Sequence, residues 1–182
     1  NTAHELGHKQ DQSKRWLAKL ALVPSSYGHF FVEHNLGHHR HVATPLDPAS
    51  AMMGENFWCF LPRTLFGGLC SAWAIEAQRL ARRGRPTIHW RNEVLQVWAG
   101  TLIMFSTAGF FLGIESILSL ALQSVLAVTL LEAVNYLEHY GLLRQKQASG
   151  KYERCNHKHS WNNNHLLSNI LTFQLQRHSD HH

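Results

Sequence analysis

Closely spaced histidines are the side chains in this sequence best suited to bind a metal. The chain holds 15 histidines in 182 residues, and eight of them form groups spaced H-x3-H, H-x3-H-H and H-x2-H-H. These groups are His4 and His8, then His34, His38 and His39, and then His178, His181 and His182. Residues three or four apart lie on one face of a helix, so each group can present several imidazoles to one metal ion. A single pair is more often a solvated polar face, but three groups in one short chain favour metal binding.

The first group also contains the pentapeptide H-E-x-x-H, which is typical of zinc peptidases. In that class of enzyme Glu5 would act as the general base between the zinc ligands His4 and His8. The longer metzincin motif needs glycine at position 11 and a third histidine at position 14, where this chain has Asp11 and Lys14. A shorter zinc peptidase stays open as an alternative, although it leaves the other two histidine groups without a role.

Two long apolar segments predict an all-α integral membrane protein. Residues 94–113 carry no charge, residues 117–137 carry a single carboxylate, and residues 113–116 link them. A helix of about 20 residues spans roughly 30 Å, the thickness of the apolar part of a bilayer. We therefore expect a transmembrane hairpin within one membrane domain covering residues 1–182. A buried helical hairpin of a soluble protein is the alternative. The chain begins and ends inside histidine motifs, so we expect it to be an internal fragment.

Basic residues flank this hairpin and are absent from its tip. They are Arg82, Arg83, Arg85 and Arg91 before it, and Arg144, Lys146 and Lys151 after it. By the positive-inside rule both ends of the hairpin are cytoplasmic and its tip is external. The net charge of +5 does not indicate nucleic-acid binding, because no basic stripe is interleaved with aromatic residues.

The second span carries a polar stripe at its cytoplasmic end. Glu132, Asn135 and His139 follow one another at i, i+3 and i+7. Polar groups at such a depth are costly and usually face a functional interior. His139 therefore joins the eight grouped histidines as a ninth candidate ligand. A tetrahedral zinc takes four ligands at most, so nine imidazoles fit two metals. Spacing alone does not choose iron over zinc or copper.

Four segments resemble the histidine motifs of the membrane-bound alkane monooxygenases. They are "HELGHK", "EHNLGHHRHV", "NYLEHYGL" and "LQRHSDHH", in that order along the chain. The simpler H-x3-H, H-x3-HH and H-x2-HH pattern is shared with other membrane desaturases and hydroxylases. The resemblance implies a non-haem di-iron centre whose ligands are the nine histidines: His4, His8, His34, His38, His39, His139, His178, His181 and His182.

The resemblance also implies the reaction and its partners. It implies terminal hydroxylation of straight-chain alkanes to primary alcohols with O2 and with electrons from rubredoxin, which a rubredoxin reductase reduces. It implies a multi-pass protein of the bacterial inner membrane with its site at the cytoplasmic face. A fatty-acyl desaturase or an aromatic methyl hydroxylase is the nearest alternative. A histidine-rich metal carrier is a further one, but it would place ligands along a path through the spans.

Carboxylates next to the histidines are expected to support them. A carboxylate that accepts an imidazole N–H fixes the tautomer and the ring orientation. The expected supporting residues are Glu5, Glu33, Glu132, Asn135, Glu138 and Asp180. We do not expect His157, His159 or His165 to bind metal directly, and His159 and His165 are candidates to orient ligands or line the access route.

Overall fold

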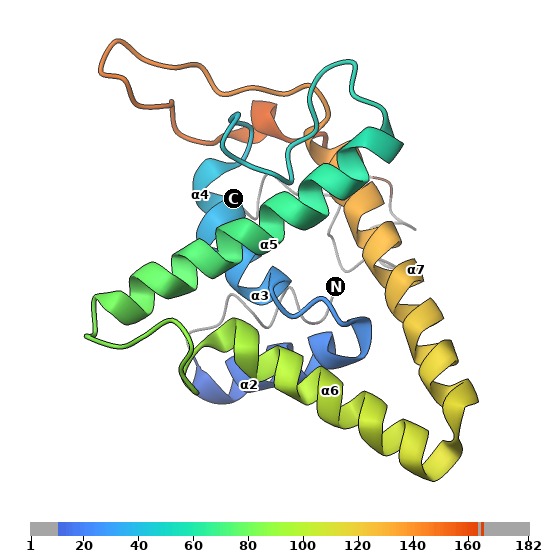
Figure 1. Cartoon of the computed structure of the whole chain (residues 1–182). Coiled ribbons are helices and arrows are strands. Elements are labelled where there is room, and N and C mark those ends of the chain that lie inside the picture. Colours follow the sequence, from blue (N-terminus) through green and yellow to red (C-terminus); the bar gives the residue numbers. More distant parts are fainter. Residues whose placement is uncertain (1–10, 164, 166–182) are drawn as a thin grey trace. The chain divides into compact units, whose positions relative to one another are not determined.

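The computed structural model describes residues 11–163 and residue 165, and this part of the chain is helical without β-strands (Figure 1). The elements are α2 (Gln12–Leu22), η1 (Val23–Ser25), α3 (Phe30–Val32), η2 (Glu33–His38), α4 (His39–His41), α5 (Phe57–Ala81), α6 (Glu93–Leu112), α7 (Ile114–His139) and η3 (His157–His159). The all-α prediction is therefore confirmed for the described residues.

Helices α6 and α7 are long and apolar enough to cross a membrane. Only 11% of the most apolar window of each helix is buried, whereas a core helix of a soluble protein is mostly buried. Large apolar side chains such as Leu102, Phe110 and Leu126 are exposed along them. Such a surface suits lipid better than water, which favours the membrane hairpin over the soluble one.

The link between the two apolar helices is shorter than predicted. We expected residues 113–116, but α7 already begins at Ile114, so Gly113 alone separates the helices. Its φ of 85° lies in the left-handed region, which glycine adopts without steric cost. One such residue turns the chain sharply, and Figure 1 shows α6 and α7 meeting there at a corner.

The described chain forms two compact units, and the described part of unit 2 comprises residues 11–37 and 68–130. Within it, α2 lies beside the start of α6, and Arg15 forms an ion pair with Glu93 at 3.0 Å. The short η1 is tied to both apolar helices. Thr101 Oγ1 donates to the carbonyl of Val23 at 3.0 Å, and Ser124 Oγ donates to that of Pro24 at 3.0 Å. These bonds pair the polar groups of α6 and α7 instead of exposing them to lipid.

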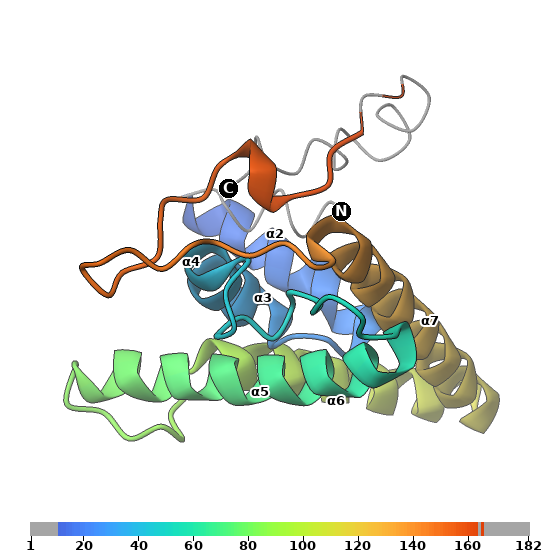
Figure 2. The same ribbon diagram turned by 90° about the horizontal axis from the view of Figure 1, so that it is seen from above.

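The described part of unit 1 comprises residues 38–67, 131–163 and 165. Two arginines shape its loops by bonding backbone carbonyls. Arg63 donates to the carbonyls of Pro48 and Ser50, and Arg144 donates to the carbonyl of Glu153. Figure 2 shows the loop after α7 and its η3 turn lying close to the end of that helix. The loops of unit 1 are thus bonded into defined conformations around the ends of α4 and α7.

Gly28 provides a stability test of unit 2. A Cβ at this position would lie 2.5 Å from Val97 Cβ, a stiff branched side chain on α6. We expect Gly28→Ala to destabilise the fold by about 1–3 kcal/mol because of this overlap. At Gly68 in α5 the nearest atom is 3.6 Å away, so Gly68→Ala is the matched control and gains helix propensity. Thermal unfolding of the full-length protein in detergent measures both, and equal midpoints would contradict the close packing at Gly28.

Candidate metal centre

The second histidine group lies on a π-helix rather than on the α-helix that we assumed. The π-helical η2 spans Glu33–His38, and α4 continues from His39. Its hydrogen bonds run from i to i+5, so each turn is wider than in an α-helix, and such turns often occur at functional sites. Residues four apart, such as His34 and His38, still project from nearly the same side.

His38 is held by a buried carboxylate. Its Nδ1 lies 2.9 Å from Asp47 Oδ2, and both side chains are inaccessible to solvent. Burial alone would raise the pKa of Asp47, but His38 and the hydroxyl of Ser50 hold that pKa below its ordinary value. The ionised carboxylate can only accept, so His38 Nδ1 is the protonated nitrogen. This tautomer places the lone pair of His38 on Nε2.

His139 is held in the same way by a backbone carbonyl. Its Nδ1 lies 3.1 Å from the carbonyl oxygen of His159, which can only accept. His139 therefore also carries its proton on Nδ1 and its lone pair on Nε2.

The side chain of His159 is engaged at both nitrogens. Its Nδ1 accepts the backbone N–H of Asn156 at 3.0 Å, and its Nε2 faces Glu153 at 3.3 Å. The bond from Asn156 N–H to Nδ1 and the bond from the His159 backbone N–H to the Asn156 side chain together form the capping box of η3, which fixes the backbone that supports His139. The backbone carbonyl of His159 thus holds a candidate ligand, while both ring nitrogens of His159 are engaged elsewhere.

The two imidazoles held in this way form a pair inside unit 1. The ring centroids of His38 and His139 are 4.9 Å apart with an interplanar angle of 62°, and the residues are 1% and 0% exposed. His39 lies beside them, with its centroid 6.0 Å from that of His38. Neutral imidazoles with Nδ1 bonded to a carboxylate or carbonyl are the donors that first-row transition metals bind through Nε2. The chemistry of this pair therefore fits a metal site.

The polar stripe of α7 is buried, as predicted, but its members bond one another and α5. Glu132 accepts from Thr64 Oγ1 at 2.9 Å and from Asn135 Nδ2 at 3.3 Å. Glu138 is also buried, and its backbone carbonyl accepts the N–H of Trp161 at 2.8 Å. The hydrogen bonds of Glu132 thus connect the last turns of α7 with α5.

Two further predicted site residues belong to unit 2. His34 is buried and stacks on Phe30 with ring centroids 4.9 Å apart. Glu33 is buried as well, and its carboxylate lies against Gly37, where a Cβ would overlap it.

Part of the predicted site lies outside the described residues. This part comprises His4, Glu5, His8, His178, Asp180, His181 and His182. Within residues 11–163 and 165, no three His, Cys, Asp or Glu side chains form a group that could hold a metal. The described chain thus contributes the pair of His38 and His139, and the nine-histidine set stays a prediction.

Sequence reasoning missed Asp47 and the His159 carbonyl. Asp47 stands in the segment "TPLDPAS", nine residues after His38 and outside the histidine motifs themselves. An acidic residue between two prolines close behind a metal-type motif is the signal that could have suggested it. A backbone acceptor such as the His159 carbonyl has no side-chain signature at all.

Comparison with known proteins identifies the family. The profile of the fatty acid desaturase family matches residues 1–182, the whole chain. The chain belongs to the fatty acid desaturase family. This is a family of non-haem iron enzymes, which agrees with the imidazole pair in this desaturase-family chain.

Bacterial alkane monooxygenases are among its similar relatives. The chain is 49% identical over 182 residues to the alkane 1-monooxygenase of Pseudomonas putida and 50% identical to that of Acinetobacter baylyi. It is 26% identical to the xylene/toluene monooxygenase hydroxylase component of Pseudomonas putida. In the two alkane enzymes the match covers 100% of this chain and 45% of the relative, so the chain spans about half their length. These matches confirm the resemblance found in the motifs.

The role of Asp47 is testable by removing its charge. In the full-length protein we expect Asp47→Asn to lower metal retention or activity roughly 10–100-fold, because a neutral amide accepts more weakly and can also donate to Nδ1, so it no longer fixes the tautomer of His38. Metal content after dialysis against a mild chelator measures this effect. Glu115→Gln is the control of equal charge change, since Glu115 is an exposed carboxylate in unit 2, outside the loop that Asp47 and Arg63 hold. Equal metal loss in both variants would contradict the role of Asp47.

Proposed function

We propose that the protein containing this chain hydroxylates the terminal carbon of straight-chain alkanes. The alkane, O2 and two reducing equivalents give a primary alcohol and water. The observation that carries the proposal is the buried pair of His38 and His139, each with Nδ1 held by an acceptor, in a chain about 50% identical to alkane 1-monooxygenases.

We propose that nine histidines hold two irons. They are His4, His8, His34, His38, His39, His139, His178, His181 and His182. When bound, iron supplies the O2 chemistry that protein side chains cannot perform. The chain supplies orientation: Asp47 and the His159 carbonyl keep the protons of their imidazoles on Nδ1. Glu5 and Asp180 are proposed to support histidines in the same way.

The apolar helices have a second role in this proposal. An alkane has no polar group to be recognised, so it is bound by apolar surface and exclusion of water. Helices α6 and α7 expose mostly apolar side chains, which offers a dry route from the bilayer.

The higher sequence identity to alkane 1-monooxygenases favours alkane hydroxylation over hydroxylation of an aromatic methyl group. The relatives named alkane 1-monooxygenase are up to 50% identical, whereas the relative named for xylene and toluene is 26% identical. An acyl desaturase remains the chemical alternative because the whole chain matches that family. Membership of this family disfavours the zinc peptidase.

We further propose rubredoxin, reduced by a rubredoxin reductase, as the electron donor. The protein would lie in the bacterial inner membrane with its metal centre at the cytoplasmic face. The basic flanks of the hairpin support this orientation by the positive-inside rule, and they suit a small acidic donor.

Iron content and product analysis test the function. The full-length protein is supplied with rubredoxin, its reductase, O2 and either octane, hexadecane or a fatty acyl substrate. We expect iron in the purified protein and a primary alcohol from an alkane. His139→Ala should lose iron and reduce the activity at least roughly 100-fold, more than Asp47→Asn does, because it removes a proposed iron ligand itself.

The matched control is His157→Ala, which removes an exposed imidazole. It should keep both iron and activity. Zinc in the active wild type, or a double bond introduced into the acyl chain with no alcohol from alkanes, would overturn the proposal.

Membrane topology is tested separately by cysteine labelling. Single cysteines replace the exposed Glu115 at the tip of the hairpin or the exposed Ser149 beyond α7, in a protein whose native cysteines are serine. An impermeant thiol reagent added to spheroplasts should modify the cysteine at position 115 but not the one at position 149. The reverse labelling pattern would place the metal centre on the outer face.

A further inference from the structure

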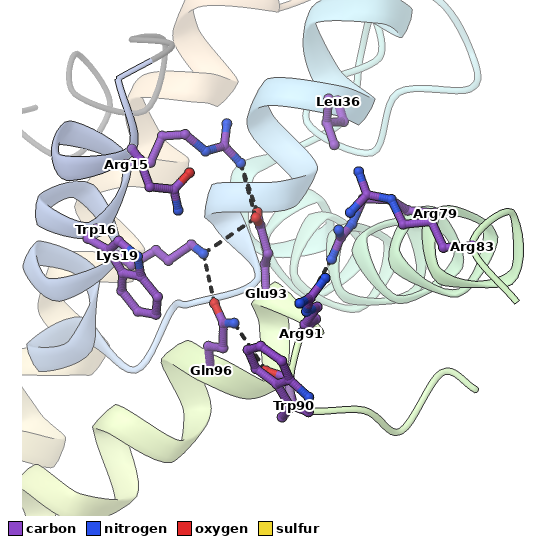
Figure 3. Close-up of a pocket in the computed structure, with 11 residues that line it drawn as sticks. Arg15, Trp16, Lys19, Leu36, Arg79, Arg83, Trp90, Arg91, Glu93 and Gln96 are labelled. Atoms are coloured by element: carbon purple, nitrogen blue, oxygen red, sulfur yellow. Dashed lines mark hydrogen bonds and ion pairs between the residues drawn. The ribbon is translucent and has the colours of Figure 1, made fainter. Parts of the chain in front are cut away.

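A basic pocket of about 710 Å³ lies in unit 2. It is bounded by α2, by the end of α5 and by the start of α6 (Figure 3). In Figure 3, Arg15 and Lys19 extend from α2 toward Glu93, Arg79 reaches Arg91 from the end of α5, and Arg83 lies beside Arg79 on the same helix. The pocket is therefore a concave site where cationic side chains from three segments converge.

Positive charge exceeds negative charge in this pocket. Its lining contains the five cations Arg15, Lys19, Arg79, Arg83 and Arg91, and the single carboxylate Glu93. Arg15 and Lys19 share Glu93, at 3.0 and 3.4 Å. Lys19 is almost fully buried, and burial lowers its pKa although Glu93 acts in the opposite sense. Because one carboxylate cannot neutralise both the Lys19 ammonium and the Arg15 guanidinium, a further anion would be bound favourably here.

Of the three remaining arginines, Arg79 is neutralised by a carboxylate and the other two are available to bind an anion. Arg79 is paired with Glu76 by two hydrogen bonds and donates a third to the carbonyl of Arg91. Arg83 and Arg91 have no carboxylate partner among the described residues. The guanidinium of Arg91 lies over the ring of Trp90, 4.6 Å from its centroid. Two forked donors thus face the pocket without a counter-charge, and guanidinium groups match phosphate oxygens geometrically.

The N-terminus of α6 does not itself provide the anion site. The side chain of Asn92 accepts the N–H groups of Val94 and Leu95, and Glu76 accepts that of Glu93. The positive character of the pocket therefore comes from side chains.

The surroundings of the pocket are those of a membrane interface. The pocket lies where the apolar helix α6 begins, and the exposed Trp16 and Trp90 line it. Tryptophan is enriched at the level of lipid headgroups, and basic residues near anionic lipids each contribute about 1 kcal/mol of attraction.

We propose that this pocket binds the phosphate headgroup of an anionic membrane phospholipid. Arg83 and Arg91 receive the phosphate oxygens, and Trp16 and Trp90 flank the glycerol region where α6 enters the bilayer. The proposal rests on α6 crossing the membrane but not on the reaction catalysed. A recessed pocket suits a small tethered headgroup better than the convex surface of an acidic protein, which would need cations on a protruding face.

Native mass spectrometry of the full-length protein in detergent tests the site. Short-chain phosphatidylglycerol and phosphatidylcholine are titrated separately, and inorganic phosphate and glycerol 3-phosphate are titrated as the soluble forms of the same chemistry. We expect a tighter apparent Kd for phosphatidylglycerol than for phosphatidylcholine and no comparable binding of the soluble anions. The double variant Arg83→Gln/Arg91→Gln should weaken phosphatidylglycerol binding roughly tenfold or more.

The matched control removes the same charge elsewhere. Arg82 and Arg154 are exposed and do not line the pocket, so Arg82→Gln/Arg154→Gln should bind phosphatidylglycerol like the wild type. Arg83→Lys/Arg91→Lys keeps the charge and should retain most of the binding, which separates lost recognition from misfolding. Equal affinity for both lipids, or equal loss in both Gln variants, would overturn the proposal.

Two other outcomes would also overturn it. Binding of inorganic phosphate as tight as that of the lipid would identify a free-anion site. Unchanged lipid binding in Arg83→Gln/Arg91→Gln, with a raised KM for the protein electron donor, would identify a docking surface for an acidic protein instead.

Discussion

The requirement to satisfy Nδ1 of two buried imidazoles governs the structure of unit 1. His38 and His139 are shielded from water, so an Nδ1–H without a protein acceptor would cost free energy in either ring. Asp47 and the His159 carbonyl meet this need, and both come from loops. The loops in turn depend on Arg63 and Arg144, which bond their carbonyls. The orientation of these two candidate ligands is thus supported from outside the helices that carry them.

The same rule explains where polar residues occur on the apolar helices. Thr101 and Ser124 bond the carbonyls of η1, and Glu132 is bonded by Thr64 and Asn135. In lipid an unpaired polar group costs several kcal/mol. The polar positions of α6 and α7 therefore mark the places where other segments of the chain are attached.

The sequence predicted those features that have a regular period or a characteristic side chain. The apolar runs indicated α6 and α7, the histidine spacing singled out His38, and the polar stripe on the second span singled out His139. Features that arise from backbone geometry were missed. The π-helical form of η2 keeps the same residues on nearly one side, so spacing does not reveal it. The one-residue link depends on the left-handed φ of Gly113, and the sequence shows that a glycine is present but not which φ it adopts. Asp47 was missed because its partner is nine residues away across an irregular loop.

Charge balance gives the buried carboxylates of unit 1 a role beyond orientation. Imidazole ligands are neutral, so metal ions held by histidines alone would bring their full charge into a buried site, which is costly unless anions lie nearby. Asp47, Glu132 and Glu138 are all buried in unit 1, and Asp47 contacts His38 directly. In a di-iron centre these carboxylates would compensate charge without occupying a coordination position. Coordination positions would then stay open for O2, which direct carboxylate ligation would restrict. The proposed histidine-only ligand set would therefore need buried acids nearby, and Asp47, which contacts His38, is such an acid.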